Sequence, residues 1–253
     1  HIQVTSMQEV GSHGLEQLDS ISIGTLSGAS NTHSIAIGDK ARAYGIDAIA
    51  FGASANATAT NAMAVGRNAR STAGGSVAVG INTEVTQINS VAMGATAKAY
   101  GDSAVSLGVD VVSRGHSAVA VGANADALAQ SAVSIGDSTL ANAHNAVSVG
   151  ISSQATAERA IAMGDSTRAT AWDGVAIGTA AKANATGAVA IGKDALANQE
   201  AGTAVGIGAE ATGQYAAAFG DVAKASVRWG TAIGTGSLAN VAAGAVGYDP
   251  SGA

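Results

Sequence analysis

A glycine stands at every fourteenth position along most of this 253-residue chain. The series runs from Gly24 through Gly38 and Gly52 to Gly234 without a gap, which makes 16 glycines in register. A fixed period of this length is the signature of a repeat architecture, in which each unit packs on its neighbours. We therefore expect a solenoid of 14-residue coils.

The residues around each repeat glycine alternate between large and small. Residues 119–122 read Val-Ala-Val-Gly, and Ala125 and Ala127 follow three and five places after that glycine. Alternation with a period of two, together with β-branched side chains, predicts a short strand on each side of the glycine. Each coil is thus expected to contain a strand, a glycine corner, a second strand and a polar turn. The predicted fold class is all-β, a parallel β-roll.

The alternation also suggests which side chains face the interior. A coil of two short strands encloses one thin layer, and we predict that the large Val and Ile side chains fill it. The small residue between them would then point outward, yet it is scarcely ever charged. Small, uncharged side chains on an outer face predict close packing against another copy of the chain. The predicted packing column is Ala36, Ala50, Ala64, Ala78, Ala92, Ser106, Ala120, Ser134, Ser148, Ala162, Ala176 and Ala190.

Charge and composition narrow the classes of partner. The formal net charge is −6, which disfavours nucleic acid as the main partner. No run of 18 apolar residues is present, so no segment is expected to span a membrane as a helix. The chain has no cysteine, which excludes disulfides and thiolate metal sites.

Candidate catalytic and metal-binding groups do not converge in the sequence. His116 and His144 share a repeat position two coils apart, about 9.6 Å by strand spacing, too far for one ion. Carboxylates such as Asp39 and Asp137 follow the glycine, but calcium-binding rolls repeat every nine residues. No nucleophile elbow or phosphate-binding loop is present. We expect no catalytic residue, no metal and no cofactor, and hence no enzyme.

Aromatic residues are the best candidates for contact with a ligand. They make up 3% of the chain, and five of them fall in turn positions. Exposed Tyr and Trp are favoured at the centres of binding interfaces. The predicted ligand-binding residues are Tyr44, Tyr100, Trp172, Tyr215 and Trp229. The alternative is that each ring covers a turn.

The coils resemble a known family. Residues 117–122 (Ser-Ala-Val-Ala-Val-Gly) and 131–136 (Ser-Ala-Val-Ser-Ile-Gly) are similar to the head repeats of YadA-like trimeric autotransporter adhesins. The resemblance covers residues 21–247. It implies a left-handed roll, a homotrimer, and an outer-membrane address on a bacterial cell surface. It also implies a stalk and a C-terminal membrane anchor outside this sequence.

The resemblance divides the chain into three segments. Residues 1–20 are expected to be an N-terminal cap or a linker, and residues 21–247 the repetitive head. Residues 240–244 (Asn-Val-Ala-Ala-Gly) are similar to part of the neck that joins head to stalk. Residues 248–253 are then either a C-terminal remnant or the start of a neck.

The expected function is that of an adhesin head. Members of the family bind extracellular matrix proteins or host cells, and several agglutinate cells, so haemagglutination and autoagglutination are also expected activities. The alternative is a structural segment of a surface or phage fibre without a specific ligand. An enzyme on a β-helix would show a six-residue period, and an ice-binding solenoid a regular rank of threonines; neither pattern is present.

Overall fold

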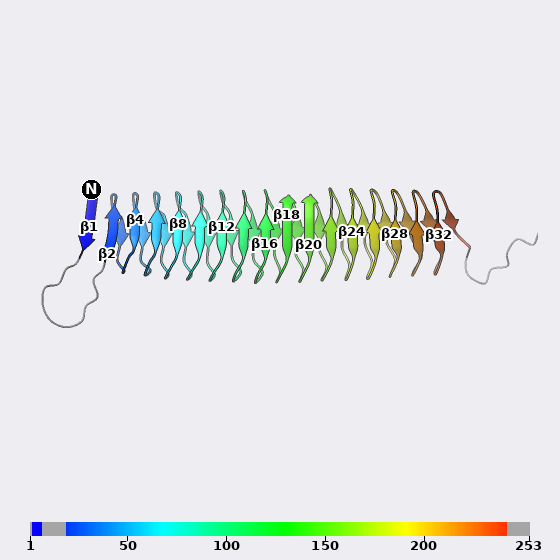
Figure 1. Ribbon diagram of the computed structural model, residues 1–253, viewed down its shortest axis with the longest axis horizontal. Coiled ribbons are helices and arrows are strands. Elements are labelled where there is room, and N and C mark those ends of the chain that lie inside the picture. The colour runs from blue at the N-terminus through cyan, green and yellow to red at the C-terminus, as the bar shows by residue number, and fades with distance from the viewer. Residues whose placement is uncertain (1, 7–18, 242–253) are drawn as a thin grey trace, which may run out of the picture. The chain divides into compact units, whose positions relative to one another are not determined.

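The computed structural model of the protein describes residues 2–6 and 19–241. It forms two compact units, residues 1–138 and 139–253. In both units the described elements are β-strands, stacked coil upon coil (Figure 1). Among the described residues there is no helix with the length and hydropathy that a membrane crossing requires.

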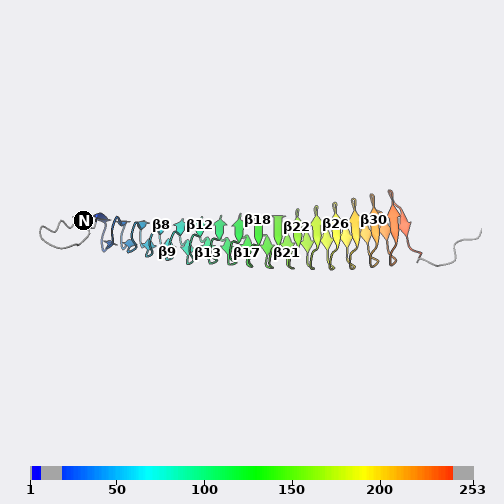
Figure 2. The ribbon, with the colours of Figure 1, turned by 60° about the horizontal axis from the view of Figure 1, so that its bottom comes forward.

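Each coil contributes two strands, which lie in two separate rows (Figure 2). We call A strands those that contain the large–small–large residues before the repeat glycine, and B strands the two-residue strands after it. In the first unit the A strands are β2 (Asp19–Ile23), β4 (Ile35–Ile37), β6 (Ile49–Phe51), β8 (Met63–Val65), β10 (Val77–Val79), β12 (Val91–Met93), β14 (Val105–Leu107), β16 (Val119–Val121) and β18 (Val133–Asp137). Its B strands are β3 (Gly28–Ala29), β5 (Arg42–Ala43), β7 (Asn56–Ala57), β9 (Arg70–Ser71), β11 (Glu84–Val85), β13 (Lys98–Ala99), β15 (Val112–Ser113) and β17 (Asp126–Ala127).

The second unit repeats this plan. Its A strands are β20 (Val147–Ile151), β22 (Ile161–Met163), β24 (Val175–Ile177), β26 (Val189–Ile191), β28 (Thr203–Val205), β30 (Ala217–Phe219) and β32 (Thr231–Ile233). Its B strands are β19 (Leu140–Ala141), β21 (Gln154–Ala155), β23 (Arg168–Ala169), β25 (Lys182–Ala183), β27 (Leu196–Ala197), β29 (Glu210–Ala211), β31 (Lys224–Ala225) and β33 (Leu238–Ala239).

The strands pair in parallel with a register of one repeat. Between β14 and β16, for example, Val105 lies beside Val119 and Ser106 beside Ala120. The same 14-residue offset relates β28 to β30 in the second unit, where Thr203 lies beside Ala217. Because equivalent residues stack on one another, each repeat position becomes a column along the unit. The predicted all-β, parallel solenoid is confirmed.

The N-terminal residues add one strand of opposite direction. β1 (Ile2–Ser6) pairs antiparallel with β2 and covers the edge of the first A strand. An open strand edge is a template for unwanted pairing, so this strand acts as a cover for that edge. Residues 7–18 and 242–253, which include the predicted C-terminal remnant and part of the predicted neck segment, lie outside the described residues.

The interior is built from small side chains, contrary to the prediction made from the alternation. Four columns point inward in each coil, as Ala118, Ala120, Ala125 and Ala127 do, and each of these residues is 0% exposed. The largest side chains that are fully buried are only valines and threonines, with Val85 among them. The two strands of a coil therefore lie too close together to enclose columns of Ile or Phe.

The large apolar side chains accordingly face outward. Phe51 and Met93 precede repeat glycines and are 52% and 45% exposed. The assignment of the small column to packing between copies is wrong, because its side chains already fill the coil of a single chain. The residues concerned, all 0% exposed, are Ala36, Ala50, Ala64, Ala78, Ala92, Ser106, Ala120, Ser134, Ser148, Ala162, Ala176 and Ala190.

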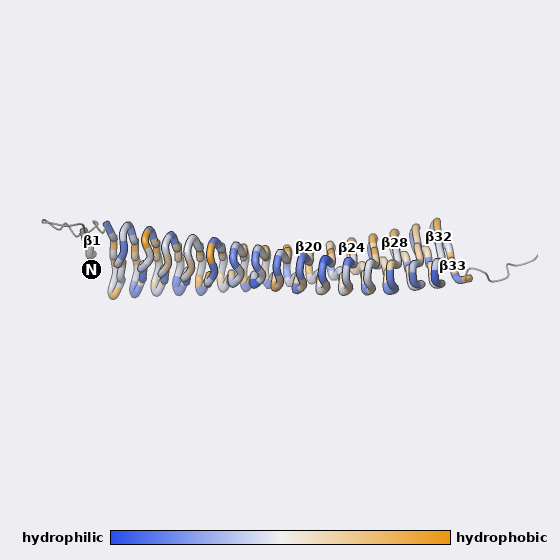
Figure 3. Tube along the Cα trace, turned by 90° about the horizontal axis from the view of Figure 1, so that it is seen from below, coloured by the Kyte–Doolittle hydropathy of each residue, from blue (hydrophilic) through white to orange (hydrophobic). Residues whose placement is uncertain are grey.

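Two sharp corners per coil require unusual backbone conformations. The second and the ninth residue after the repeat glycine adopt positive φ, as Asn124 (52°) and Ser131 (54°) do. Asn, Asp and Ser are common in these two columns, and Asn and Asp tolerate the left-handed region better than most residues. The corners thus explain why polar residues recur at fixed places in each coil, between hydrophobic stretches (Figure 3).

Candidate adhesive surface

The outward face of the A strands, here called the A face, is apolar along both units. In the first unit it exposes Phe51, Met93 and Ile135, and in the second Met163, Ile177, Ile191, Phe219 and Ile233. The residues two places earlier, such as Val105 and Val119, are half-buried in the same face. Contiguous apolar surface of this kind marks a contact with another macromolecule. An apolar outer face was not predicted from the sequence, because the large side chains were expected to lie inside the coil.

The B strands present a polar face. Arg70 and Glu84 form an ion pair with 3.9 Å between Nη1 and Oε1, and the Tyr100 hydroxyl donates to Glu84 Oε2 at 2.6 Å. Burial, followed by the hydrogen bond to Glu84, raises the pKa of Tyr100 to about 12. Tyr100 is thus held on the B face by a carboxylate of the preceding coil.

Tyr44 occupies the equivalent position, six residues after the repeat glycine. Its ring lies over Gly28, where an added Cβ would come within 3.2 Å of Tyr44 Cε1. The side chain is still 43% exposed. Tyr44 therefore packs on strand β3 of the preceding coil, and part of its side chain remains exposed.

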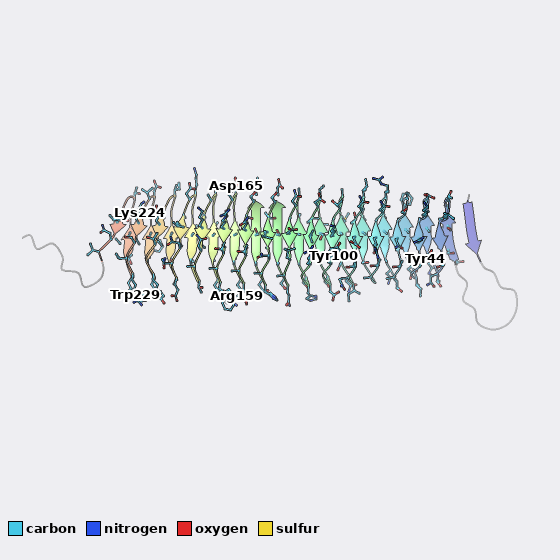
Figure 4. The ribbon with its side chains drawn as sticks, turned by 180° about the vertical axis from the view of Figure 1, so that it is seen from behind. Tyr44, Tyr100, Arg159, Asp165, Lys224 and Trp229 are labelled. Carbon is cyan, nitrogen blue, oxygen red and sulfur yellow. The ribbon has the colours of Figure 1, made fainter. Side chains whose placement is uncertain are left out.

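The other three predicted aromatics lie in the turn that leads from a B strand to the next A strand. We call the eighth and ninth residues after each repeat glycine of the second unit the turn edge. Trp172 belongs to it and is 53% exposed. Arg159, one coil earlier, places its guanidinium carbon 5.2 Å from the centroid of the Trp172 ring. Figure 4 shows Arg159 and Trp229 on the same edge, opposite Asp165.

Carboxylates surround the Arg159 guanidinium. Its Nε and Nη2 donate to the two carboxylate oxygens of Asp173 at 2.6 and 2.8 Å, and Nη1 donates to Glu158 at 3.0 Å. The hydrogen bonds from Arg159 lower the pKa of Asp173. The cation beside Trp172 is therefore already paired.

Tyr215 and Trp229 form a stacked pair on the turn edge. Their ring centroids are 4.2 Å apart and the planes differ by 12°. The Tyr215 hydroxyl donates to Glu200 Oε1 at 3.1 Å, and Gln214 Nε2 donates to Glu200 Oε2 at 2.7 Å. Both aromatic residues have positive φ, 58° and 61°. A bulky residue in this region costs roughly 1–2 kcal/mol, so the stack is held in a strained backbone.

Titratable groups elsewhere in the described part of the chain do not gather into a metal site. Among the residues that the structure describes, no three His, Asp or Glu side chains lie close enough together to hold an ion. His116 and His144 are both exposed. His33 Nδ1 instead lies 2.9 Å from Asp47 Oδ1 in the next coil, a pair of neighbouring turn residues.

Comparison with known proteins assigns the repeat. The family model for the YadA head domain repeat (2 copies) matches residues 18–41, 43–69, 57–83, 71–95, 86–110, 113–139, 141–167 and 169–195, together more than half of the chain. Among solved structures, the collagen-binding domain of the Yersinia adhesin YadA matches with 26% sequence identity and a TM-score of 0.45, over 61% of this chain and 79% of that one. None of the curated proteins matches the sequence. The chain belongs to the family of YadA head domain repeats.

Proposed function

We propose that this chain is the binding head of a bacterial surface adhesin that attaches to host cells or extracellular matrix proteins. The run of YadA head repeats over residues 18–195 is the observation that carries the proposal, since it supports a role as the head of an adhesin. The outward display of large apolar and aromatic side chains is consistent with it. Agglutination of red cells or of bacteria would follow from the same binding. The chain then acts by contact and not by catalysis.

We also propose that three copies associate through the A face. Burial of apolar area stabilises association by about 25 cal/mol per Å², and this face repeats the same exposed columns from coil to coil. The number three comes from the family resemblance. An outer-membrane anchor and a stalk would lie outside this sequence and hold the head away from the cell. Three parallel heads would also raise the apparent affinity of weak contacts by avidity.

The test is attachment of the purified chain to surfaces coated with collagen, fibronectin or laminin, and to red cells and epithelial cells. The expected result is saturable binding to at least one of them above an albumin-coated surface. Met163→Asp tests the role of the proposed trimer in attachment. It places a charge on the A face and leaves the turn edge unchanged. It should weaken attachment by removing avidity. Absence of binding to every surface and cell would favour a purely structural fibre segment.

A further inference from the structure

We propose that the turn edge at Trp229 binds a sugar that carries a carboxylate, such as the terminal residue of an acidic glycan. The site consists of the Trp229 indole, the Tyr215 ring behind it and the Arg228 guanidinium beside them. The inference rests on the adhesive function proposed above, and it names a ligand class for one part of the surface.

The indole of Trp229 offers a flat apolar surface of the size of a sugar ring. Its side chain is 60% exposed, although the ring stacks on Tyr215 at 4.2 Å. Glu200 fixes Tyr215 through its hydroxyl, so the ring behind the indole is held in place. The C–H groups on one face of a pyranose make dispersion contacts with such a ring. A rigid aromatic platform loses little conformational entropy when a ligand binds.

The register of the coils places the two rings one above the other. The ninth residue after the repeat glycine has positive φ in coil after coil of this unit, including Arg159 (57°) and Ala201 (49°). Tyr215 and Trp229 occupy that position in successive coils with φ of 58° and 61°. Their side chains therefore leave the backbone at equivalent corners and stack on each other.

Arg228 supplies the charge. Its guanidinium carbon is 5.6 Å from the Trp229 centroid and 6.0 Å from the Tyr215 centroid. Because these distances are nearly equal, the guanidinium lies beside the stack and not over the outer face of the indole. Within residues 19–241, Arg228 forms no ion pair with a carboxylate, whereas Arg159 beside Trp172 is paired with Asp173 and Glu158. A guanidinium of this kind can bind a carboxylate through two parallel hydrogen bonds.

The backbone of the site favours a sugar over a peptide. The amide of Trp229 donates to the Gln214 carbonyl at 3.0 Å, and that of Tyr215 to the Glu200 carbonyl at 2.9 Å. An extended peptide binds largely through backbone hydrogen bonds with a free strand edge, and these amides already have partners within the coils. Side chains supply the contacts that remain, namely a ring face and a guanidinium. Ring stacking combined with a carboxylate describes a sugar acid.

The test compares two polyacrylamide probes, one carrying sialyllactose and the other carrying lactose, on the intact chain in its native oligomeric state. The sialyllactose probe should bind at least about tenfold more tightly than the lactose probe. Trp229→Ala and Arg228→Gln should each reduce its binding at least about tenfold. Arg168→Gln and Ile207→Ala, two exposed residues of the same unit outside the turn edge, are the matched controls and should bind as the unmodified chain does. Circular dichroism on all four variants checks that the strands remain folded.

Equal binding of the two probes, or unchanged binding by Arg228→Gln, would overturn the inference. So would competition by an acidic peptide but not by free sialic acid. Cell attachment that persists in Trp229→Ala and after sialidase treatment, with no binding of the sialyllactose probe, would reject the sugar site and leave the adhesin intact. If the unmodified chain attached to none of the cells or coated surfaces, that result would instead reject the adhesive function itself.

Discussion

Gly108 lies directly against Gly122 of the next coil, so that a Cβ at Gly108 would come within 1.8 Å of the Gly122 carbonyl oxygen. The φ of Gly108 is +141°, which side chains of L-residues rarely adopt. The repeat glycine is thus required both by the space between coils and by the backbone at the corner.

Gly108→Ala should therefore destabilise the solenoid strongly. We expect the free energy of unfolding to fall by at least about 3 kcal/mol, because a methyl group would force apart two backbones that cannot yield. Thermal or urea unfolding followed by circular dichroism measures the change. Gly74→Ala is the control: it has no positive φ, and its nearest contact would be an ordinary 3.7 Å to the Thr60 carbonyl. It should change stability by no more than about 0.5 kcal/mol, and a Gly108→Ala protein as stable as this control would contradict the packing described.

The inward direction of the small column predicts a large effect of a modest substitution. Ala120 is 0% exposed, so Ala120→Leu must enlarge a coil with no spare volume and should cost about 1–3 kcal/mol or more. Val121→Ile is the control, since Val121 lies on the A face and Ile37 and Ile135 already occupy its column. The free energy of unfolding of both variants, measured in urea, tests this prediction. If Ala120→Leu were tolerated and abolished only oligomer formation, the small column would face another copy after all.

Buried hydroxyl pairs cross the interior in some coils. Ser106 Oγ lies 2.8 Å from Ser113 Oγ, and Ser113 Oγ donates to the Val105 carbonyl at 2.6 Å. Replacing Ser113 alone by Ala removes a partner and should cost about 1 kcal/mol. The next coil already has Ala at both equivalent positions. Replacing both serines by Ala should therefore cost no more than the single change. A double-mutant cycle in urea measures the coupling, and strictly additive costs would show that the two hydroxyls act independently.

Stability at high pH should depend on Tyr100. Burial and the hydrogen bond to Glu84 raise the pKa of its phenol from 10.0 to about 12. Between these two values the folded chain retains a proton that the unfolded chain has lost, so this contribution is complete below pH 10 and declines as the pH rises toward 12. Tyr100→Phe should reduce that decline in unfolding experiments. The phenolate absorbance of the Tyr100→Phe variant should differ from that of the unmodified chain only as the pH approaches 12. A difference centred at pH 10 would contradict the burial of the Tyr100 hydroxyl.

The sequence predicts the coil well and its inside poorly, for a physical reason. Spaced glycines and the alternation of large and small residues determine strands, corners and register, because these depend on backbone geometry. An alternation with a period of two defines two faces but does not say which face is buried. Four small columns per coil, as at Ala118, Ala120, Ala125 and Ala127, carry the missing information. A coil that thin has interior volume mostly for methyl and hydroxymethyl groups, with a valine or threonine at a few positions such as Val85.

The candidate site was predicted in part. All five turn aromatics carry exposed or half-exposed surface, but their partners depend on contacts between coils. One readable signal is a residue pair of opposite charge spaced by 14, such as Arg159 and Asp173, which the register places side by side. The stacking of Tyr215 on Trp229 follows the same spacing. That Arg228 has no carboxylate partner within residues 19–241 depends on the side-chain geometry of several turns, which the sequence pattern does not specify.

The mass of the purified chain in solution tests the proposed trimer most directly. Light scattering coupled to size exclusion should give three times 24.2 kDa for the unmodified chain, because the apolar A face would be covered by the other copies. Met163→Asp should shift the mass toward a single chain while the strands stay folded. A folded chain that remains at 24.2 kDa at all concentrations would show that the A face does not join copies of the protein.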